Sequence, residues 1–118
     1  MTVEADIVSR LGQLVANKIW PDIAPLNTVG PYLTFQQVGG EAIGFLGLEK
    51  PSKKNGRFQV NTWTRSRLET AALMRQVEDS MITSPVLTAT AVSAPTAIYD
   101  EDTKLYGAIQ DFYIWFDD

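Results

Sequence analysis

The N-terminal stretch repeats apolar residues at intervals of three and four, with polar residues between them. This spacing predicts an amphipathic helix. Thr2 is a suitable N-cap, and the acidic residues of the first turn favour the positive end of the helix dipole. We expect the helix to end near Ile19, because the residue before Pro21 avoids the helical region. The apolar positions that define its buried face are Val3, Ile7, Leu11, Leu14 and Val15.

The segment from Trp20 to Pro31 predicts an ordered loop rather than a flexible linker. Its three prolines fix the local φ angle and lower the entropy of the unfolded chain. The segment also carries Trp20, Ile23 and Leu26, which we expect to pack against the body of the protein.

Alternating residues predict two strands that build a long β-hairpin. Tyr32 to Val38 and Arg57 to Thr64 form these strands, and Gly39-Gly40 suggests a bulge or a turn. Residues 41–48 could continue the first strand irregularly. Residues 49–56 read as a polar loop that ends in an Asn-Gly turn.

A second helix is predicted from Ser66, which with Glu69 matches a capping box, to about Ile82. The residues expected to face the core are Leu68, Ala71, Ala72, Val77 and Met81.

The C-terminal part predicts three more strands. The first spans residues 86–92. The others, residues 95–99 and 104–116, form a hairpin around an acidic turn. The last strand is apolar on both faces toward its end, so we expect it to be central or covered on both sides. The whole pattern predicts a single α+β domain over residues 1–118. It has a mostly antiparallel β-sheet with two helices packed on one face and a long β-hairpin.

Composition excludes several kinds of chemistry. The 118 residues contain neither cysteine nor histidine, so no Ser-His-Asp or Cys-His arrangement and no sulfur-ligated metal is possible. We therefore expect no enzyme, no metal and no cofactor. The net charge of −4 argues against a DNA-binding surface. It suits a surface past which DNA slides, although mild acidity also serves solubility alone.

No window approaches the roughly 20 apolar residues that span a membrane. Residues 1–6 are acidic and lack the basic start of a signal peptide, so we expect synthesis and assembly in the host cytoplasm.

Three segments together resemble the tail completion (tail terminator) proteins of long-tailed bacteriophages, the family of the lambda tail terminator. They are Ile19-Trp20-Pro21-Asp22-Ile23-Ala24-Pro25, Gly30-Pro31-Tyr32-Leu33-Thr34-Phe35, and Arg57 to Thr64 leading into a helix. The resemblance implies a structural protein of the virion tail, at the end next to the head. There it would form a hexameric ring that caps the tail tube, ends its polymerisation and offers the head-attachment surface.

The implied partners are other copies of the chain, the tail-tube protein and a head-completion or connector protein. Genomic DNA would pass through without specific binding. The state of the free protein, monomer or ring, stays open. Two alternatives remain: a head-tail connector subunit, and a host binding module that recognises a small ligand or a peptide by strand addition.

Two groups of residues are candidates for the interface. Trp20 and Trp63 are either aromatic anchors or residues that seal the sheet edge. Lys50, Lys53 and Lys54 are either an arm that docks onto an acidic partner or DNA, or a solvated hairpin tip.

The acidic turn Asp100, Glu101 and Asp102 is a candidate lining of the ring lumen, or a solvated turn. Its spacing lacks the ligand ladder of a calcium loop, and no polar pattern around it supports acid-base catalysis.

Overall fold

The computed structural model describes residues 2–42 and 53–117, and it begins with helix α1 (Val3–Gly12). The hydroxyl of Thr2 accepts a hydrogen bond from the amide of Ala5 at 3.1 Å, which confirms the predicted N-cap. The helix ends at Gly12, so the prediction that it continues to Ile19 is wrong. Ala16 and Asn17 adopt positive φ angles of 51° and 65°, and a left-handed backbone cannot continue a right-handed helix.

Strand β1 (Ile19–Pro21) occupies the place where the sequence predicted the end of the helix and the start of a loop. It pairs in parallel with β2 (Tyr32–Gln37), with Ile19 opposite Leu33. The strand is short, lies at the edge of the sheet and ends in a proline. Such a strand offers little for further strand pairing.

Strand β3 (Lys53–Thr64) pairs antiparallel with β2, as the hairpin prediction required. It starts before the predicted strand, so the predicted turn at Asn55-Gly56 is wrong: Gly56 pairs with Ile114 inside the sheet. A Cβ atom on Gly56 would lie 2.6 Å from the ring of Phe58, so glycine is needed for close packing rather than for a turn. Of the expected strand over residues 41–48, Glu41 and Ala42 lie outside any strand and the rest falls beyond the described ranges.

Helix α2 (Arg67–Ile82) begins as predicted, because the Ser66 hydroxyl accepts the amide hydrogen of Glu69 at 3.1 Å. The second half of the capping box is absent. The amide of Ser66 bonds instead to the hydroxyl of Thr64 at 3.3 Å.

The predicted buried face of α2 is partly wrong, because Leu68 is 84% exposed. The hydroxyl of Thr70 bonds to the Tyr106 carbonyl at 2.8 Å and to the Thr64 hydroxyl at 2.5 Å. These bonds turn a polar residue toward the sheet and leave Leu68 outside. The buried residues of the helix are Thr70, Leu73, Met74, Val77 and Met81.

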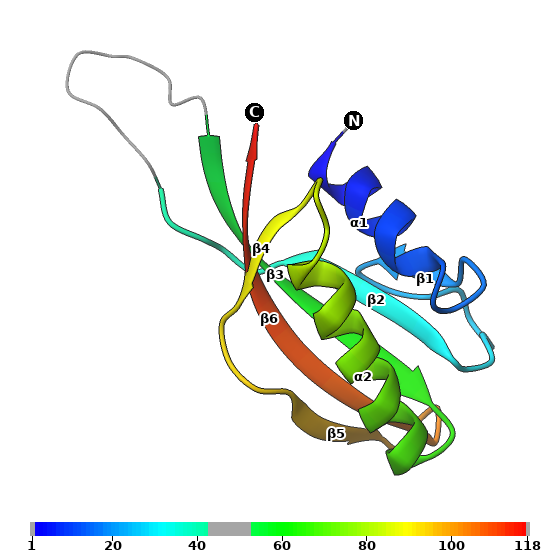
Figure 1. The fold of residues 1–118 in the computed structure, drawn as a ribbon. Helices are drawn as coiled ribbons and strands as arrows, with labels where there is room; N and C mark the ends of the chain where they lie inside the picture. The colour runs from blue at the N-terminus through cyan, green and yellow to red at the C-terminus, as the bar shows by residue number, and fades with distance from the viewer. Residues whose placement is uncertain (1, 43–52, 118) are drawn as a thin grey trace.

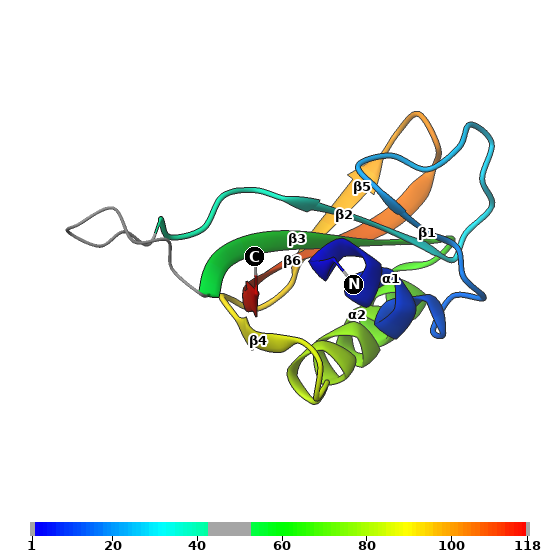
Figure 2. The same cartoon turned by 90° about the horizontal axis from the view of Figure 1, so that it is seen from above.

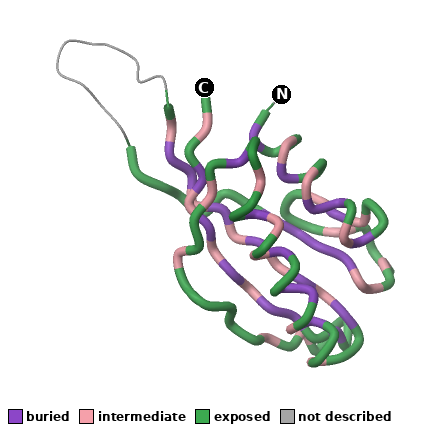
Figure 3. The backbone as a smooth tube through the Cα atoms, in the orientation of Figure 1, coloured by how far each residue is buried: buried purple, intermediate pink, exposed green. Residues whose placement is uncertain are grey.

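The remaining strands are β4 (Thr88–Ala91), β5 (Thr96–Asp100) and β6 (Leu105–Asp117). The strand order is β1-β2-β3-β6-β4, and β5 pairs with the same central β6. This confirms the α+β class with a mostly antiparallel sheet and the central place of the last strand. Figures 1 and 2 show both helices on one side of the sheet, and Figure 3 shows buried residues along both the helices and the strands. Residues of both layers form one hydrophobic core.

Candidate functional site

The sheet face opposite the helices carries polar and aromatic side chains. Tyr32 pairs with Trp63 across β2 and β3, and Thr34 pairs with Asn61. The hydroxyl of Thr34 accepts hydrogen bonds from the Asn61 amide at 3.2 Å and from the Trp63 indole nitrogen at 3.3 Å. On the other side of Trp63, a Cβ on Gly107 would lie 2.7 Å from its ring. The indole is therefore fixed in position.

Two segments far apart in the sequence border this face and form a groove of about 840 Å³. One is the loop of residues 22–30 after β1. The other is the end of β5 with the turn that leads into β6. Both lie on the side of the sheet away from the helices (Figure 2). We call this hollow the outer groove; its floor includes Tyr32, Thr34, Asn61 and Trp63.

The loop of residues 22–30 is held by hydrogen bonds yet presents apolar side chains to solvent. Ile23 is 80% exposed and Leu26 is 92% exposed, so the prediction that they pack against the body is wrong. Asp22 and Asn27 have positive φ angles of 63° and 66°, and the backbone of the loop turns at these residues. The bonds that hold it run from Asp22 N to Phe35 O (2.8 Å), from Thr28 N to Pro25 O (3.2 Å) and from Lys18 Nζ to Val29 O (3.0 Å).

The charged groups of the outer groove are mostly acidic. Asp22, Asp100 and Asp102 line it with one guanidinium, that of Arg65. Burial raises the pKa of the Tyr32 hydroxyl above its ordinary value of 10.0, and the negative charge of Asp100 raises it further. Tyr32 therefore stays protonated at neutral pH and can donate a hydrogen bond.

The structure brings the two predicted tryptophans to the same face. Trp20 meets the ring of Tyr32 edge-on, with centroids 6.1 Å apart, and Tyr32 is the cross-strand partner of Trp63. Both tryptophans are half-buried. Neither tryptophan is fully buried, as a core residue would be, and neither is fully exposed, as a free interface anchor would be.

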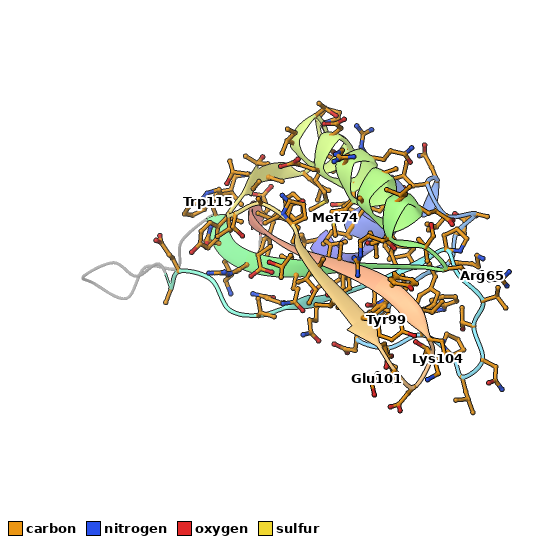
Figure 4. All side chains as sticks on the ribbon, turned by 90° about the horizontal axis from the view of Figure 1, so that it is seen from below. Arg65, Met74, Tyr99, Glu101, Lys104 and Trp115 are labelled. Atoms are coloured by element: carbon orange, nitrogen blue, oxygen red, sulfur yellow. The ribbon has the colours of Figure 1, made fainter. Side chains whose placement is uncertain are left out.

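The acidic turn lies at the same end of the molecule. Asp100 is the last residue of β5, and its carboxylate accepts the amide hydrogen of Asp102 at 3.0 Å. Figure 4 shows Glu101 and Lys104 at the tip of this hairpin, and Arg65 at the same end of the sheet. Glu101 is exposed and is not among the residues that line the outer groove.

The lysine cluster lies at the opposite end of β3. Lys53 and Lys54 are the first residues of the strand and pair with Asp117 and Phe116, so the predicted hairpin tip is wrong for these two. Lys53 forms an ion pair with Asp117 at 3.0 Å, in which both side chains are more than half exposed. Such a pair adds little stability. Lys50 falls outside the described residues.

Sequence reasoning missed Tyr32, Asp22 and Arg65 as groove residues. The alternation of β2 places Tyr32 on the face opposite Leu33 and Phe35, which was the available signal for this residue. The prolines on both sides of Ile23 were the available signal for a rigid loop, but nothing local in the sequence showed that this loop faces the acidic turn.

The protein thus combines a mostly antiparallel sheet covered on one face by two helices with a groove on the opposite face. A family model described as tail completion protein gp17 matches residues 7–117. The chain therefore belongs to this family of structural proteins of bacteriophage tails, which confirms the resemblance seen in the sequence and the location in the virion tail. No curated protein matches the sequence.

Two solved structures share the fold. One is a chain from the virion of a native gene transfer agent particle, at 14% identity and a TM-score of 0.66, covering 98% of this chain and 95% of that one. The other is the gp17 protein of bacteriophage SPP1, at 14% identity and a TM-score of 0.57, covering 98% of this chain and 88% of that one. In the described parts of the chain, neither helix is long and apolar enough to cross a membrane.

Proposed function

We propose that the protein assembles into a closed, hexameric ring on the end of the tail tube. There it stops further tube polymerisation and provides the surface to which the head attaches. Membership of the tail completion family supports this role. The structural observation that carries it is the hydrogen-bonded loop of residues 22–30. The loop keeps Ile23 and Leu26 in solvent, as expected for a surface that is covered only after assembly.

A ring needs two different surfaces on each subunit, because each copy contacts its two neighbours in a head-to-tail manner. The described chain offers different chemistry at the two ends of β3: the acidic outer groove at one end, and the strand ends that carry Lys53 and Asp117 at the other. The molecule is elongated, with extents of 52 × 25 × 23 Å, so the two regions are well separated.

The other expected partners follow from this position. The ring contacts the tail-tube protein on one side and a head-completion or connector protein on the other. DNA passes through its centre without specific binding. The acidic turn at Asp100 to Asp102 is a candidate for the lumen wall, and Glu101, which is exposed and does not line the outer groove, is the residue of the turn that can face the lumen while the groove is occupied. Acidic residues there would repel phosphate and reduce sticking. Assembly takes place in the host cytoplasm.

Tube elongation in vitro tests the proposal. Purified tube protein is polymerised with and without this protein, and tube lengths and ends are measured by electron microscopy. We expect shorter tubes whose ends carry a ring of six subunits. Tubes of unchanged length with bare ends would refute the capping role. Decorated tubes that keep growing would indicate a connector instead.

A further inference from the structure

We propose, on the basis of the assembly function above, that the outer groove binds an extended segment of a partner protein in which a lysine or arginine lies beside an apolar residue. The groove is bordered by one apolar and one acidic segment, and its floor offers hydrogen-bonding side chains. Each of these features selects one part of that ligand.

The acidic groups select the cationic side chain. Three carboxylates, those of Asp22, Asp100 and Asp102, line the groove with only the guanidinium of Arg65 to balance them. Trp63 adds an aromatic ring that Thr34 holds in place. An aromatic ring near carboxylates suits an organic cation, which gains both cation–π and ion-pair attraction. Within residues 2–42 and 53–117, no three acidic side chains converge closely enough to hold a metal ion, so a larger cation fits better.

Tyr32 offers a hydrogen-bond donor to a segment in the groove. The residue is only 7% exposed and lines the groove, yet its hydroxyl forms no hydrogen bond with any residue of the described ranges. The hydroxyl oxygen is not among the fully buried, unpartnered polar atoms of the described residues, so it is open to a partner in the groove. Because the hydroxyl stays protonated, it calls for an acceptor, and a backbone carbonyl of an extended segment supplies one.

The loop of residues 22–30 selects the apolar side chain. Ile23 and Leu26 are exposed, but the backbone that carries them is already ordered by hydrogen bonds. Binding to them therefore costs little additional ordering of the protein, which favours association. The polar side chains of Gln36, Gln59 and Asn61 also line the groove and can pair with the backbone of an extended segment.

The test uses the isotope-labelled full-length protein and three synthetic peptides followed by NMR. The first peptide alternates leucine and arginine, the second alternates leucine and glutamate, and the third alternates serine and arginine. We expect saturable shifts of the Trp63 indole signal with the leucine–arginine peptide, and affinities at least about tenfold weaker for the other two.

Matched variants assign the binding to the groove. Asp100→Asn with Asp102→Asn removes two charges but keeps oxygen acceptors, so we expect about tenfold weaker binding of the leucine–arginine peptide. Tyr32→Phe removes only the hydroxyl and should weaken binding several-fold. Asp79→Asn is the control, because this exposed residue lies on α2, on the other side of the sheet. Its binding should match that of the wild type.

Three results would overturn the inference: no saturable binding of the leucine–arginine peptide, a stronger response to the acidic peptide, or wild-type binding by the double asparagine variant. Tube capping is measured separately on the same samples. Peptide binding without capping would refute the proposed function but support peptide binding by the groove. Capping by a protein that binds no peptide would support the proposed function but refute peptide binding by the groove.

Discussion

Arg67 connects helix α2 to the hairpin that forms the acidic wall of the outer groove. Its guanidinium donates one hydrogen bond to the Gly107 carbonyl and one to the Ile98 carbonyl, both at 2.6 Å. It also lies over the ring of Tyr106, 5.3 Å from the centroid. Replacing it by methionine keeps the apolar stem and the helix propensity but removes all three interactions.

The loss of folding stability in Arg67→Met can be estimated from these contacts. Hydrogen bonds from charged groups contribute about 1.5 to 3 kcal/mol each. Because Arg67 is half-buried, the lower value applies, and two bonds give about 3 kcal/mol. The cation–π contact adds roughly 0.5 kcal/mol at such a site. Arg67→Met should therefore lower the free energy of unfolding by about 3.5 kcal/mol, which corresponds to roughly 14 °C in Tm for a chain of this size.

Urea unfolding at a concentration where the protein is monomeric measures the change. Arg75→Met is the matched control, because Arg75 is exposed on the same helix, and it should stay within about 0.5 kcal/mol of the wild type. Arg67→Lys should fall in between, since a point-like ammonium cannot reproduce the fork that reaches both carbonyls. A loss of stability in Arg67→Met no larger than in Arg75→Met would refute the reasoning.

Three further predictions concern the sheet and its two ends. Gly56→Ala should cost about 1 to 3 kcal/mol in urea unfolding, because the added Cβ meets the ring of Phe58; an unchanged midpoint would show that the ring moves freely. The raised pKa of Tyr32 means that the folded state holds its proton above pH 10.0, where the unfolded state releases it. Stability should therefore fall as pH rises above that value, less steeply in Tyr32→Phe, and equal slopes would contradict the assignment. Charge reversal of Lys53 and Lys54 to glutamate should weaken ring assembly, as measured by sedimentation. Ring formation equal to that of the wild type would show that this end of β3 is not part of the interface.

Local signals in the sequence were sufficient for much of the fold. Thr2 and Ser66 cap their helices as predicted, because a cap depends only on neighbours within one turn. The alternation over residues 57–64 also predicted the strand there, and the apolar character of β6 predicted its central place.

Contacts between residues far apart in the sequence explain the features of the fold that were predicted wrongly. Val15 is buried as its periodicity implies, and Ile19 is buried too, but the chain reaches the core through a turn and a strand rather than a helix. Thr70 is buried because its partners are Thr64 and Tyr106, the second of them far along the chain.

The outer groove could not be predicted for the same reason. It unites the loop after β1 with the turn after β5, and only the completed sheet brings these segments together. The sequence marked Trp63, Asp100 and Asp102 as separate candidates, and the structure combines them in one site.

Electron microscopy of particles from the parent phage lacking this gene tests the capping role most directly. We expect overlong tails without heads, because nothing ends tube growth or offers the head a surface. Tails of normal length beside filled heads would contradict termination and leave only a joining role. Intact, infectious particles would contradict any role in tail assembly.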